Sequence, residues 1–387
     1  SEMEFDGERI ARRGIVVVTV NYRLNVFGFL CHPEITAEAP EAPANFGHLD
    51  QQAGIKWVKR NIAAFGGDPD NITIGGQSAG GGSVLCHLTS PQSKGLFNRA
   101  IIQSGMITPV YPGNRVPRHR RTLADAEQEG VEFFKFLGVK SLAEARKLDA
   151  KYVMEKALQY KNFWSMIWGT VQDDKFCVGN PYDLFVNNKR VMVPLLTGHT
   201  SSEFFSTPRA ETMDEFRKMA ADIFGEDADE FLSLCNAQSG DIEEVRRRAS
   251  VSGIEYSIRV AAQANDQSKT GVPIYYYNFD AEIPGWDNPG TFHSVDLWFF
   301  FETLAKCWRP FTGKHYDLAR QMCNYWCNFI KNGDPNGKDS TGEEMERWEP
   351  YTTEAPYCMV FGDKPKFVRE QPSDLMKFLV KQYFKRK

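Results

Sequence analysis

A serine stands inside a G-x-S-x-G pattern, in the run Gly76-Gln77-Ser78-Ala79-Gly80, between a β-branched stretch and a run compatible with a helix. A tight turn from strand to helix lifts such a serine above the edge of a sheet, which is the geometry of a nucleophile elbow. We expect Gly76 and Gly80 to be glycine because larger side chains would collide in so tight a turn. Ser78 is therefore the predicted nucleophile.

A serine hydroxyl needs a histidine as its base, and the histidine needs a carboxylate that fixes its tautomer. Four of the seven histidines lie near or before the elbow or in a basic loop: His32, His48, His87 and His119. His293 lies between a predicted strand and an aromatic helix, as a base at a sheet edge should. His199, read as a loop residue near the site, and His315, read as a helix cap or a surface residue, are the alternatives.

The carboxylate should follow the serine and precede the histidine in chain order. Glu203 fits, because it lies just beyond the strand expected at 193–198 and is followed by Phe204-Phe205. Asp296 is the rival, one helical turn after His293, but it would break the usual order.

Strands and helices alternate along the chain, which predicts a doubly wound α/β protein with a parallel sheet. The predicted strands are 15–20, one that begins at 72, 100–103, 193–198 and 274–279, and the predicted helices are about 50–64, from the elbow to 88, within 212–265, 316–332 and at the C-terminus. We expect one catalytic domain over 1–387, with core regions at 1–110 and 191–387 and a helical insertion at about 111–190.

The 387 residues carry a formal net charge of −4 with a pI of about 6.0, which argues against nucleic acid or an anionic membrane as partner. The longest aliphatic run is far shorter than the roughly 20 apolar residues that cross a bilayer, so no membrane anchor is expected. The eight cysteines are scattered in apolar surroundings, which favours a reducing, cytoplasmic location over secretion. No metal or organic cofactor is implied.

Several longer stretches resemble the type B carboxylesterases, the cholinesterase-like branch of the α/β-hydrolases. They extend across nearly the whole chain: Val17–Arg23, Asp50–Ala53, Trp57–Pro69, Gln103–Gly105, Gly198–Glu203 and His293-Ser294 with Leu297-Trp298. The resemblance implies an α/β-hydrolase fold, with a mostly parallel central sheet, helices on both faces and a helical lid region.

The same resemblance implies hydrolysis of carboxylic esters through an acyl-enzyme, with Ser78, His293 and Glu203 as the triad. It also implies that Ser104 supports the triad carboxylate without touching the substrate, and that Arg23 and Asp50 form a structural ion pair. Gln77 stands where cholinesterases carry a glutamate that helps to hold a cationic substrate, and this departure argues against choline esters.

A second departure concerns the oxyanion hole. Ala79 can supply one N–H, but the family's His-Gly-Gly loop is absent, and the chain starts without an initiator Met or a signal peptide. We expect an N-terminal segment of the same protein to complete the fold and supply the other donors. Each missing donor costs roughly 2.7 to 4 kcal/mol of transition-state stabilisation, so the 387-residue chain by itself is expected to be nearly inactive.

The substrate is expected to be a small-molecule ester. Aromatic side chains that could wall an apolar pocket are Trp164, Trp168, Phe204, Phe205, Trp298 and Phe299. Para-nitrobenzyl and hydroxycinnamoyl esters are plausible, which leaves a feruloyl or acyl-polysaccharide esterase as an alternative. A catalytically silent adhesion or binding module of the same fold is the alternative from another class.

Overall fold

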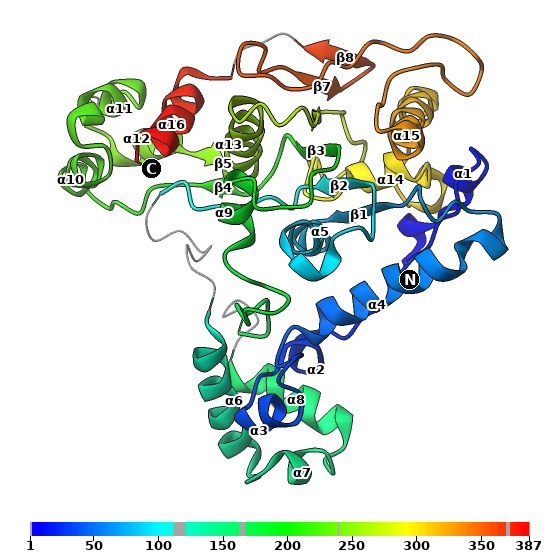
Figure 1. The fold of residues 1–387 in the computed structure, drawn as a ribbon. Coiled ribbons are helices and arrows are strands. Elements are labelled where there is room, and N and C mark those ends of the chain that lie inside the picture. Colours follow the sequence, from blue (N-terminus) through cyan, green and yellow to red (C-terminus); the bar gives the residue numbers. More distant parts are fainter. Residues whose placement is uncertain (1, 112–120, 162–166, 239, 369–371, 387) are drawn as a thin grey trace.

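The computed structural model describes residues 2–111, 121–161, 167–238, 240–368 and 372–386. A six-stranded sheet forms its centre, in the order β1-β2-β3-β6-β7-β8, and every neighbouring pair is parallel except the antiparallel pair β7–β8 (Figure 1). The strands are β1 (Thr73–Gln77), β2 (Arg99–Gln103), β3 (Leu195–Thr200), β6 (Ile274–Phe279), β7 (Cys358–Phe361) and β8 (Pro365–Val368). The predicted mostly parallel sheet is confirmed.

Alternate side chains of the central strands point into two different cores, as the period of a strand requires. On β3, Leu195 packs into one core and Leu196 into the other; on β6, Tyr276 and Tyr277 divide in the same way. Both faces of a parallel sheet must be covered, which explains why all six residues of β3 are buried and why β6 is almost continuously apolar.

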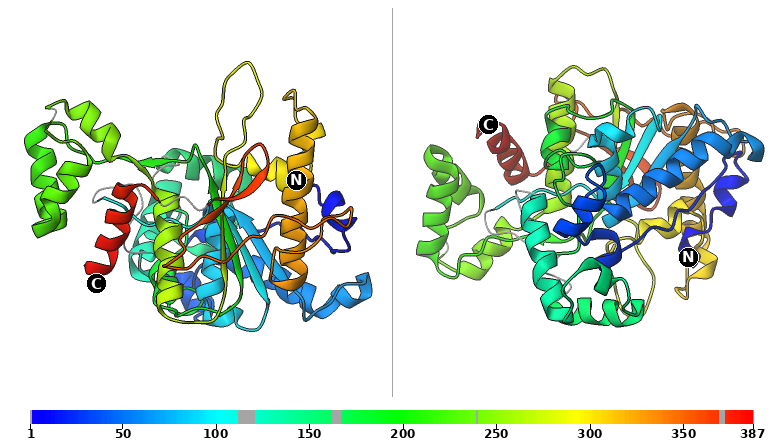
Figure 2. Two further views of the ribbon diagram at one scale, coloured as in Figure 1. Left: turned by 90° about the horizontal axis from the view of Figure 1, so that it is seen from above. Right: turned by 60° about the horizontal axis from the view of Figure 1, so that its bottom comes forward.

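Helices cover both faces. The first face is covered by α5 (Ala79–Thr89), α9 (Pro181–Val186), α13 (Gly253–Gln267) and α16 (Asp374–Lys385), and the second by α14 (Asp296–Phe300) and α15 (Gly313–Asn332). Figure 2 shows α13 and α16 on one side of the sheet and α15 on the other. The first core continues into α10 (Met213–Phe224), α11 (Ala228–Leu234) and α12 (Ile242–Ala249), and the short strands β4 (Phe205–Ser206) and β5 (Val251–Ser252) pair antiparallel.

The predicted insertion at 111–190 contains a helical lobe below the sheet in Figure 1. It consists of α6 (Leu123–Leu137), α7 (Leu142–Ala145) and α8 (Ala150–Tyr160), packed against α2 (Asn25–Phe29). Phe133 and Phe134 are at the centre of its own apolar core. The helical character is confirmed, and the role of a lid stays a prediction.

The N-terminal part contains α1 (Glu8–Ala11), α3 (Pro33–Glu38) and α4 (Phe46–Asn61). The strand predicted at 15–20 is wrong: this segment has no regular secondary structure and forms no ladder with any described strand, and β1 pairs only with β2. Val16, Val18 and Val20 are exposed. Because β-branched residues become a strand only where a neighbouring strand can pair with them, the sequence pattern was insufficient here.

Within the described ranges, no helix combines the length and the apolar character that crossing a membrane requires.

Candidate active site

Ser78 occupies a sharp turn between β1 and α5. Its backbone has φ 53° and ψ −117°, a conformation with positive φ that residues other than glycine rarely adopt. The Ser78 N–H donates to the carbonyl of Gln103 on β2 at 2.8 Å, which ties the turn to the sheet. This is the strained strand-to-helix turn expected of a nucleophile elbow.

The two glycines of the elbow differ in how crowded their positions are. A Cβ on Gly76 would lie 2.3 Å from the Gly80 carbonyl oxygen, so only glycine fits at that position. A Cβ on Gly80 would meet no atom within 4 Å, so the expectation of crowding was wrong there. The close approach is therefore made by the backbone of Gly80, and the position that must lack a side chain is Gly76.

Glu203 follows β3 and is almost fully buried, with an exposed fraction of 3%. Its carboxylate accepts hydrogen bonds from the N–H and the hydroxyl of Thr200, both at 3.2 Å, and its Oε2 lies 2.7 Å from Nδ1 of His293. Burial would raise the pKa of Glu203, but the bond to His293, the Ser104 hydroxyl and the Thr200 N–H hold that pKa below its usual range. Glu203 therefore stays ionised.

His293 lies in the connection from β6 to α14, where its loop is attached to the Glu203 loop. The N–H of Ser202 donates to the Thr291 carbonyl at 3.2 Å, and Ser202 and Phe292 form a parallel bridge. These contacts lie next to Glu203 and His293 in the chain, so the backbone itself sets the distance between the two side chains. The sequence prediction that paired Glu203 with His293 agrees with this geometry.

The second ring nitrogen of His293 contacts Gln77, the residue before Ser78. The amide nitrogen of Gln77 lies 3.2 Å from Nε2 of His293, while no hydrogen bond joins His293 to Ser78 in this structure, where both residues are described. A bond from nucleophile to base is often loose before a substrate binds. The structure thus brings His293 into contact with Glu203 through one ring nitrogen and with Gln77, the residue before Ser78, through the other.

Asp296, the rival carboxylate, is fully buried on α14 and makes no hydrogen bond to His293, although the structure describes both. It accepts hydrogen bonds from the Tyr277 hydroxyl at 2.7 Å and from the Gln103 amide at 3.3 Å. Burial raises the pKa of Asp296 to about 6, even though both hydrogen bonds oppose this shift. Asp296 therefore makes its hydrogen bonds to Tyr277 and Gln103 and not to His293.

Ser104 and Ala79 were predicted to support the Glu203 carboxylate and to supply an oxyanion donor, respectively. Ser104 follows β2 with φ 49°, and its N–H donates to the Gly198 carbonyl at 2.8 Å. Its buried hydroxyl helps to lower the pKa of Glu203, although its geometry does not meet the criteria of a hydrogen bond. Ala79 is the first residue of α5, where a backbone N–H has no acceptor within the helix. That N–H is free to face a developing oxyanion.

The predicted aromatic residues are distributed over several parts of the molecule. Phe204 lies with its ring centroid 4.8 Å from that of His293 although it is 65% exposed, and Phe205 is 61% exposed. Trp298 packs on the second core. Two further members pack internally, with Trp168 edge-on to Phe133 in the helical lobe at 5.1 Å and Phe299 against Phe279 at 4.8 Å. Trp164 lies outside the described residues.

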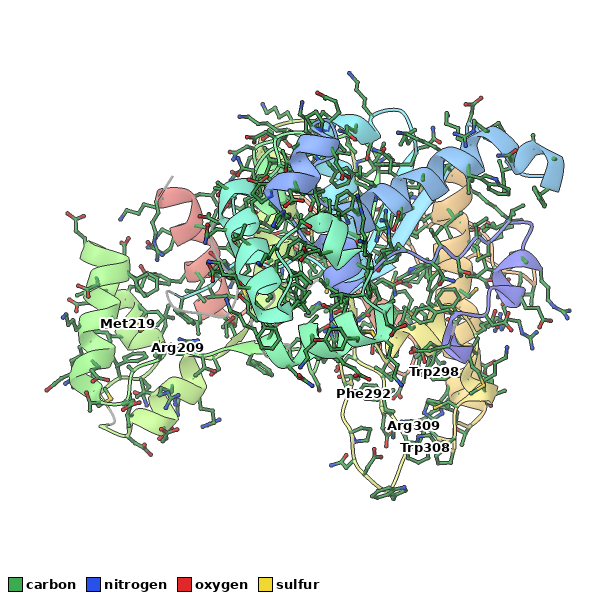
Figure 3. The ribbon with its side chains drawn as sticks, turned by 90° about the horizontal axis from the view of Figure 1, so that it is seen from below. Arg209, Met219, Phe292, Trp298, Trp308 and Arg309 are labelled. Atoms are coloured by element: carbon green, nitrogen blue, oxygen red, sulfur yellow. The ribbon has the colours of Figure 1, made fainter. Side chains whose placement is uncertain are left out.

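Arg309 holds the loop that leads to His293. Its guanidinium donates twice to Asp287, at 2.9 Å each, and once to the Pro284 carbonyl at 3.1 Å. It also lies over the rings of Phe292, at 5.3 Å, and Trp308, at 4.6 Å (Figure 3). In Figure 3 this group is well separated from Arg209 and Met219 in the α10–α12 region. The sequence pattern had given no sign of this support.

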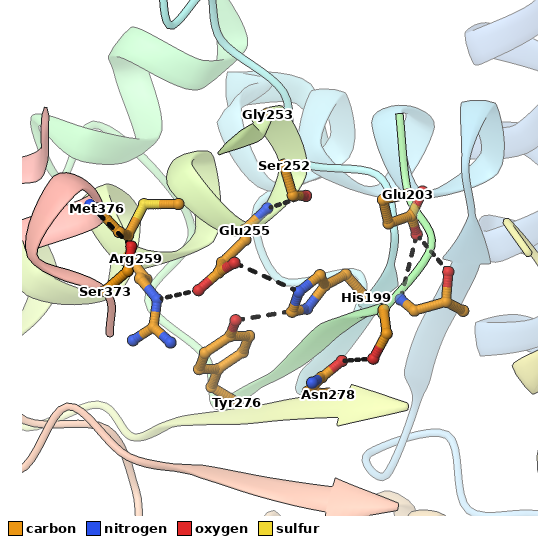
Figure 4. A network of polar contacts seen from close by, with 12 residues as sticks. His199, Glu203, Ser252, Gly253, Glu255, Arg259, Tyr276, Asn278, Ser373 and Met376 are labelled. Carbon is orange, nitrogen blue, oxygen red and sulfur yellow. Dashed lines mark hydrogen bonds and ion pairs between the residues drawn. The ribbon is translucent and has the colours of Figure 1, made fainter. Parts of the chain in front are cut away.

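His199 is buried within β3, so reading it as a loop residue was wrong (Figure 4). Its Nδ1 lies 3.4 Å from the Tyr276 hydroxyl and its Nε2 4.0 Å from Glu255, which is paired with Arg259 at 2.7 Å. Burial lowers the pKa of His199, although Glu255 and Glu203 oppose this shift. With its ring enclosed in this network, His199 is not placed to serve as the base.

Among the described residues, no group of three or more His, Cys, Asp or Glu side chains could hold a metal ion. The side chains of the site itself offer a hydroxyl on a strained turn, an imidazole and a buried carboxylate.

The ion pair Arg23–Asp50, which the resemblance implies, is formed with two hydrogen bonds of 2.8 Å each. It connects the segment after 15–20 to helix α4.

Known proteins share both the sequence and the fold. Bovine (Bos taurus) bile salt-activated lipase is 30% identical over 90% of this chain and 62% of its own length, and the human (Homo sapiens) one is 29% identical over 90% and 49%. Para-nitrobenzyl esterase of Bacillus subtilis (strain 168) is 30% identical over 94% of this chain and 73% of its own length. The chain thus spans only about half to three fifths of the two bile salt-activated lipases.

Solved structures agree with these matches. A PNB esterase superimposes with a TM-score of 0.72 at 27% identity, covering 98% of this chain and 78% of the other. A carboxylesterase of Geobacillus stearothermophilus superimposes with a TM-score of 0.69 at 28% identity, with the same coverage. Their fold is the α/β-hydrolase fold, as predicted. The profile of the carboxylesterase family matches residues 1–378, and the chain belongs to this family.

Proposed function

We propose that this protein hydrolyses carboxylic esters, with Ser78 as nucleophile, His293 as base and Glu203 as the carboxylate that orients the base. The observation that carries the proposal is the 2.7 Å contact between Glu203 and His293 beside the strained turn at Ser78. A carboxylate on Nδ1 keeps the lone pair of the imidazole on Nε2, where it can accept a proton.

In the first half of the reaction, the Ser78 oxygen attacks the ester carbonyl carbon and its proton passes to Nε2 of His293. The carbonyl oxygen becomes an oxyanion, which the Ala79 N–H stabilises. The oxyanion collapses, the alkoxide leaves with the proton from His293, and an acyl-serine remains. Water then gives its proton to His293 and attacks the acyl carbon, and Ser78 leaves with that proton.

The sequence expectation that further oxyanion donors come from a preceding segment of the same protein stays a prediction. It is tested by comparing the hydrolysis rates of the 387-residue chain with those of a longer form. Equal rates would contradict it.

The aromatic surface next to His293 supports an ester with an apolar or aromatic group. Phe204 contacts the base and Phe205 is exposed beside it, so both side chains are available to a substrate. We propose aryl esters such as para-nitrobenzyl esters, in line with the name of the bacterial relatives. Hydroxycinnamoyl esters share the aromatic ring, and they are the alternative substrate class on the same evidence.

A fluorophosphonate reacts only with an activated serine, so it tests the proposal directly. For the longer form that carries the preceding segment, we expect the adduct on Ser78, no adduct in Ser78→Ala, and ester hydrolysis that Ser78→Ala abolishes. A label on another serine would refute the mechanism, and no labelling at all would favour a silent binding module. Relative kcat/KM values for short-chain, para-nitrobenzyl and hydroxycinnamoyl esters would decide between the substrate classes.

A further inference from the structure

We infer that Gln77 is a switching hydrogen-bond partner of the base: its amide donates to Nε2 of neutral His293 and turns its oxygen to the same atom once His293 is protonated. The inference rests on the proposed function and concerns a residue that touches the reacting nitrogen itself. It starts from the 3.2 Å contact between the Gln77 amide nitrogen and Nε2 of His293.

The direction of this hydrogen bond follows from the other side of the ring. Because Nδ1 of His293 lies 2.7 Å from the ionised Glu203, the ring proton is on Nδ1 and Nε2 carries the lone pair. An amide N–H can only donate, so Gln77 donates to that lone pair. This is the same lone pair that must accept the Ser78 proton. Gln77 therefore keeps this lone pair in a hydrogen bond until a substrate binds.

Gln77 is well placed to hold this position. It is the last residue of β1, and it is paired in register with Gln103 of β2, so its backbone is fixed by the sheet. Its side chain leaves the strand one residue before Ser78 and is half-buried. The contact is thus made by a rigid element and not by a mobile loop.

Protonation of His293 reverses the requirement. An imidazolium has N–H groups at both nitrogens, so Nε2 then needs an acceptor and is repelled by the amide N–H. The last torsion of a glutamine side chain is broad and roughly two-fold, so a half turn replaces the N–H by the carbonyl oxygen at little cost. Glutamine can serve both charge states, an ionised glutamate can only accept, and methionine cannot donate and accepts only weakly through its sulfur.

The other carboxylates around His293 are Glu203 and Asp296, and both have hydrogen-bond partners. Glu203 contacts Nδ1, and Asp296 on α14 is buried nearby with the Tyr277 hydroxyl and the Gln103 amide as donors. The exposed ring of Phe204 covers one side of the imidazole. A neutral residue at 77 therefore leaves Glu203 as the one carboxylate in contact with the ring among the described residues.

The test is the pH profile of kcat/KM for a para-nitrophenyl ester, measured over the acidic and neutral range for the wild type, Gln77→Glu and Gln77→Met. Gln77→Glu adds a carboxylate next to Nε2, which favours the imidazolium, so we expect the midpoint of the acidic limb to rise by about one pH unit or more. Gln77→Met should leave that midpoint near the wild-type value and lower the plateau about tenfold or more, because the thioether is a much weaker acceptor for the imidazolium than the amide oxygen.

Gln159→Glu, exposed on α8, adds the same charge in the helical lobe and should reproduce the wild-type profile. Fluorophosphonate labelling of Ser78 in every variant separates the two proposals. If Ser78 is labelled and esters are cleaved, but Gln77→Glu and Gln77→Met both keep the wild-type midpoint and plateau, the switching role of Gln77 is wrong while the proposed function stands. If Ser78 is not labelled in the wild type of the longer form that carries the preceding segment, both are wrong.

Discussion

Glu203 and His293 are 90 positions apart in the chain, and their side chains meet at 2.7 Å. The two loops that carry them are joined by the Ser202 N–H and the Thr291 carbonyl and by the bridge between Ser202 and Phe292. The contact is thus fixed by the backbone of two neighbouring parallel strands, β3 and β6, and not only by the attraction between the two side chains.

The charge of Glu203 is expected to be essential for the base. A glutamine in its place would keep the shape of the side chain but could donate its N–H to Nδ1, which would move the ring proton to Nε2 and leave no lone pair for Ser78. We expect Glu203→Gln to lower kcat about a thousandfold or more, with little change in the melting temperature. Steady-state kinetics with a para-nitrophenyl ester checks this, and Glu211→Gln, an exposed position, is the control. A loss below about tenfold would contradict the assigned role.

The strained backbone at Ser78 should lower the free energy of unfolding, and substitutions at this position can measure the effect. Ser78→Gly removes the Cβ that makes φ 53° costly, whereas Ser78→Ala keeps that Cβ and also removes the hydroxyl. Both variants should be inactive, but only Ser78→Gly should gain about 1 kcal/mol in the free energy of unfolding. Urea unfolding of the two variants side by side gives the answer, and equal stabilities would mean that the turn is not strained.

The two glycines of the elbow should respond in opposite ways to alanine. Gly76→Ala places a methyl group 2.3 Å from the Gly80 carbonyl oxygen, and we expect it to destabilise the protein by about 1 to 3 kcal/mol. Gly80→Ala meets open space at the start of α5 and should be neutral or stabilising by up to about 1 kcal/mol. Thermal unfolding of both variants tests the pair. Similar losses in both would contradict the described turn.

Asp296 should make the protein less stable as the pH rises. Its pKa in the folded state is about 6, above the ordinary value of 3.8, so between these values the folded protein keeps a proton that the unfolded chain has lost. Stability from this group is therefore complete below about pH 4 and lost above pH 6, a difference on the order of 3 kcal/mol.

Asp296→Asn should remove this part of the pH dependence, because the amide oxygen still accepts from Tyr277 but carries no charge. Urea unfolding at several values from about pH 4 to pH 7 measures the effect, and Asp214→Asn, a highly exposed position, serves as the control. An unchanged slope in Asp296→Asn would show that the carboxyl is ionised in the folded protein at these pH values.

Phe204 should act on the substrate rather than on the fold. Its side chain is 65% exposed and lies against the ring of His293, so Phe204→Ala costs little buried area but removes an aromatic contact next to the reacting atoms. We expect kcat/KM to fall about tenfold for aryl esters and much less for short alkyl esters. Phe136→Ala, also exposed but on α6, should leave both values unchanged, and an equal loss for both ester classes would exclude a role in selecting the aromatic group.

Local patterns in the sequence predicted a large part of this protein. Strand β6 begins and ends at the predicted residues, and β1, β2 and β3 overlap the predicted strands closely, because each contains apolar residues, such as Ile74, Ile101 and Leu196, of the kind that a parallel strand buries. The segment 15–20 is at least as rich in aliphatic residues but pairs with no described strand, since pairing depends on a neighbouring strand. His199 was misplaced for a related reason: one residue decides whether a position ends a strand or follows it.

By itself, the sequence determined which residue types were available for chemistry, their order along the chain, and the turn that exposes Ser78, because each of these depends on residues close together in the chain. Only the tertiary structure decided that Glu203 rather than Asp296 contacts His293. It also decided that His199 is enclosed by Glu255 and Tyr276, and that Gln77 contacts Nε2 of His293. These choices depend on the register of neighbouring strands and on which side chains burial brings together. Both are set by contacts between segments that are distant in sequence.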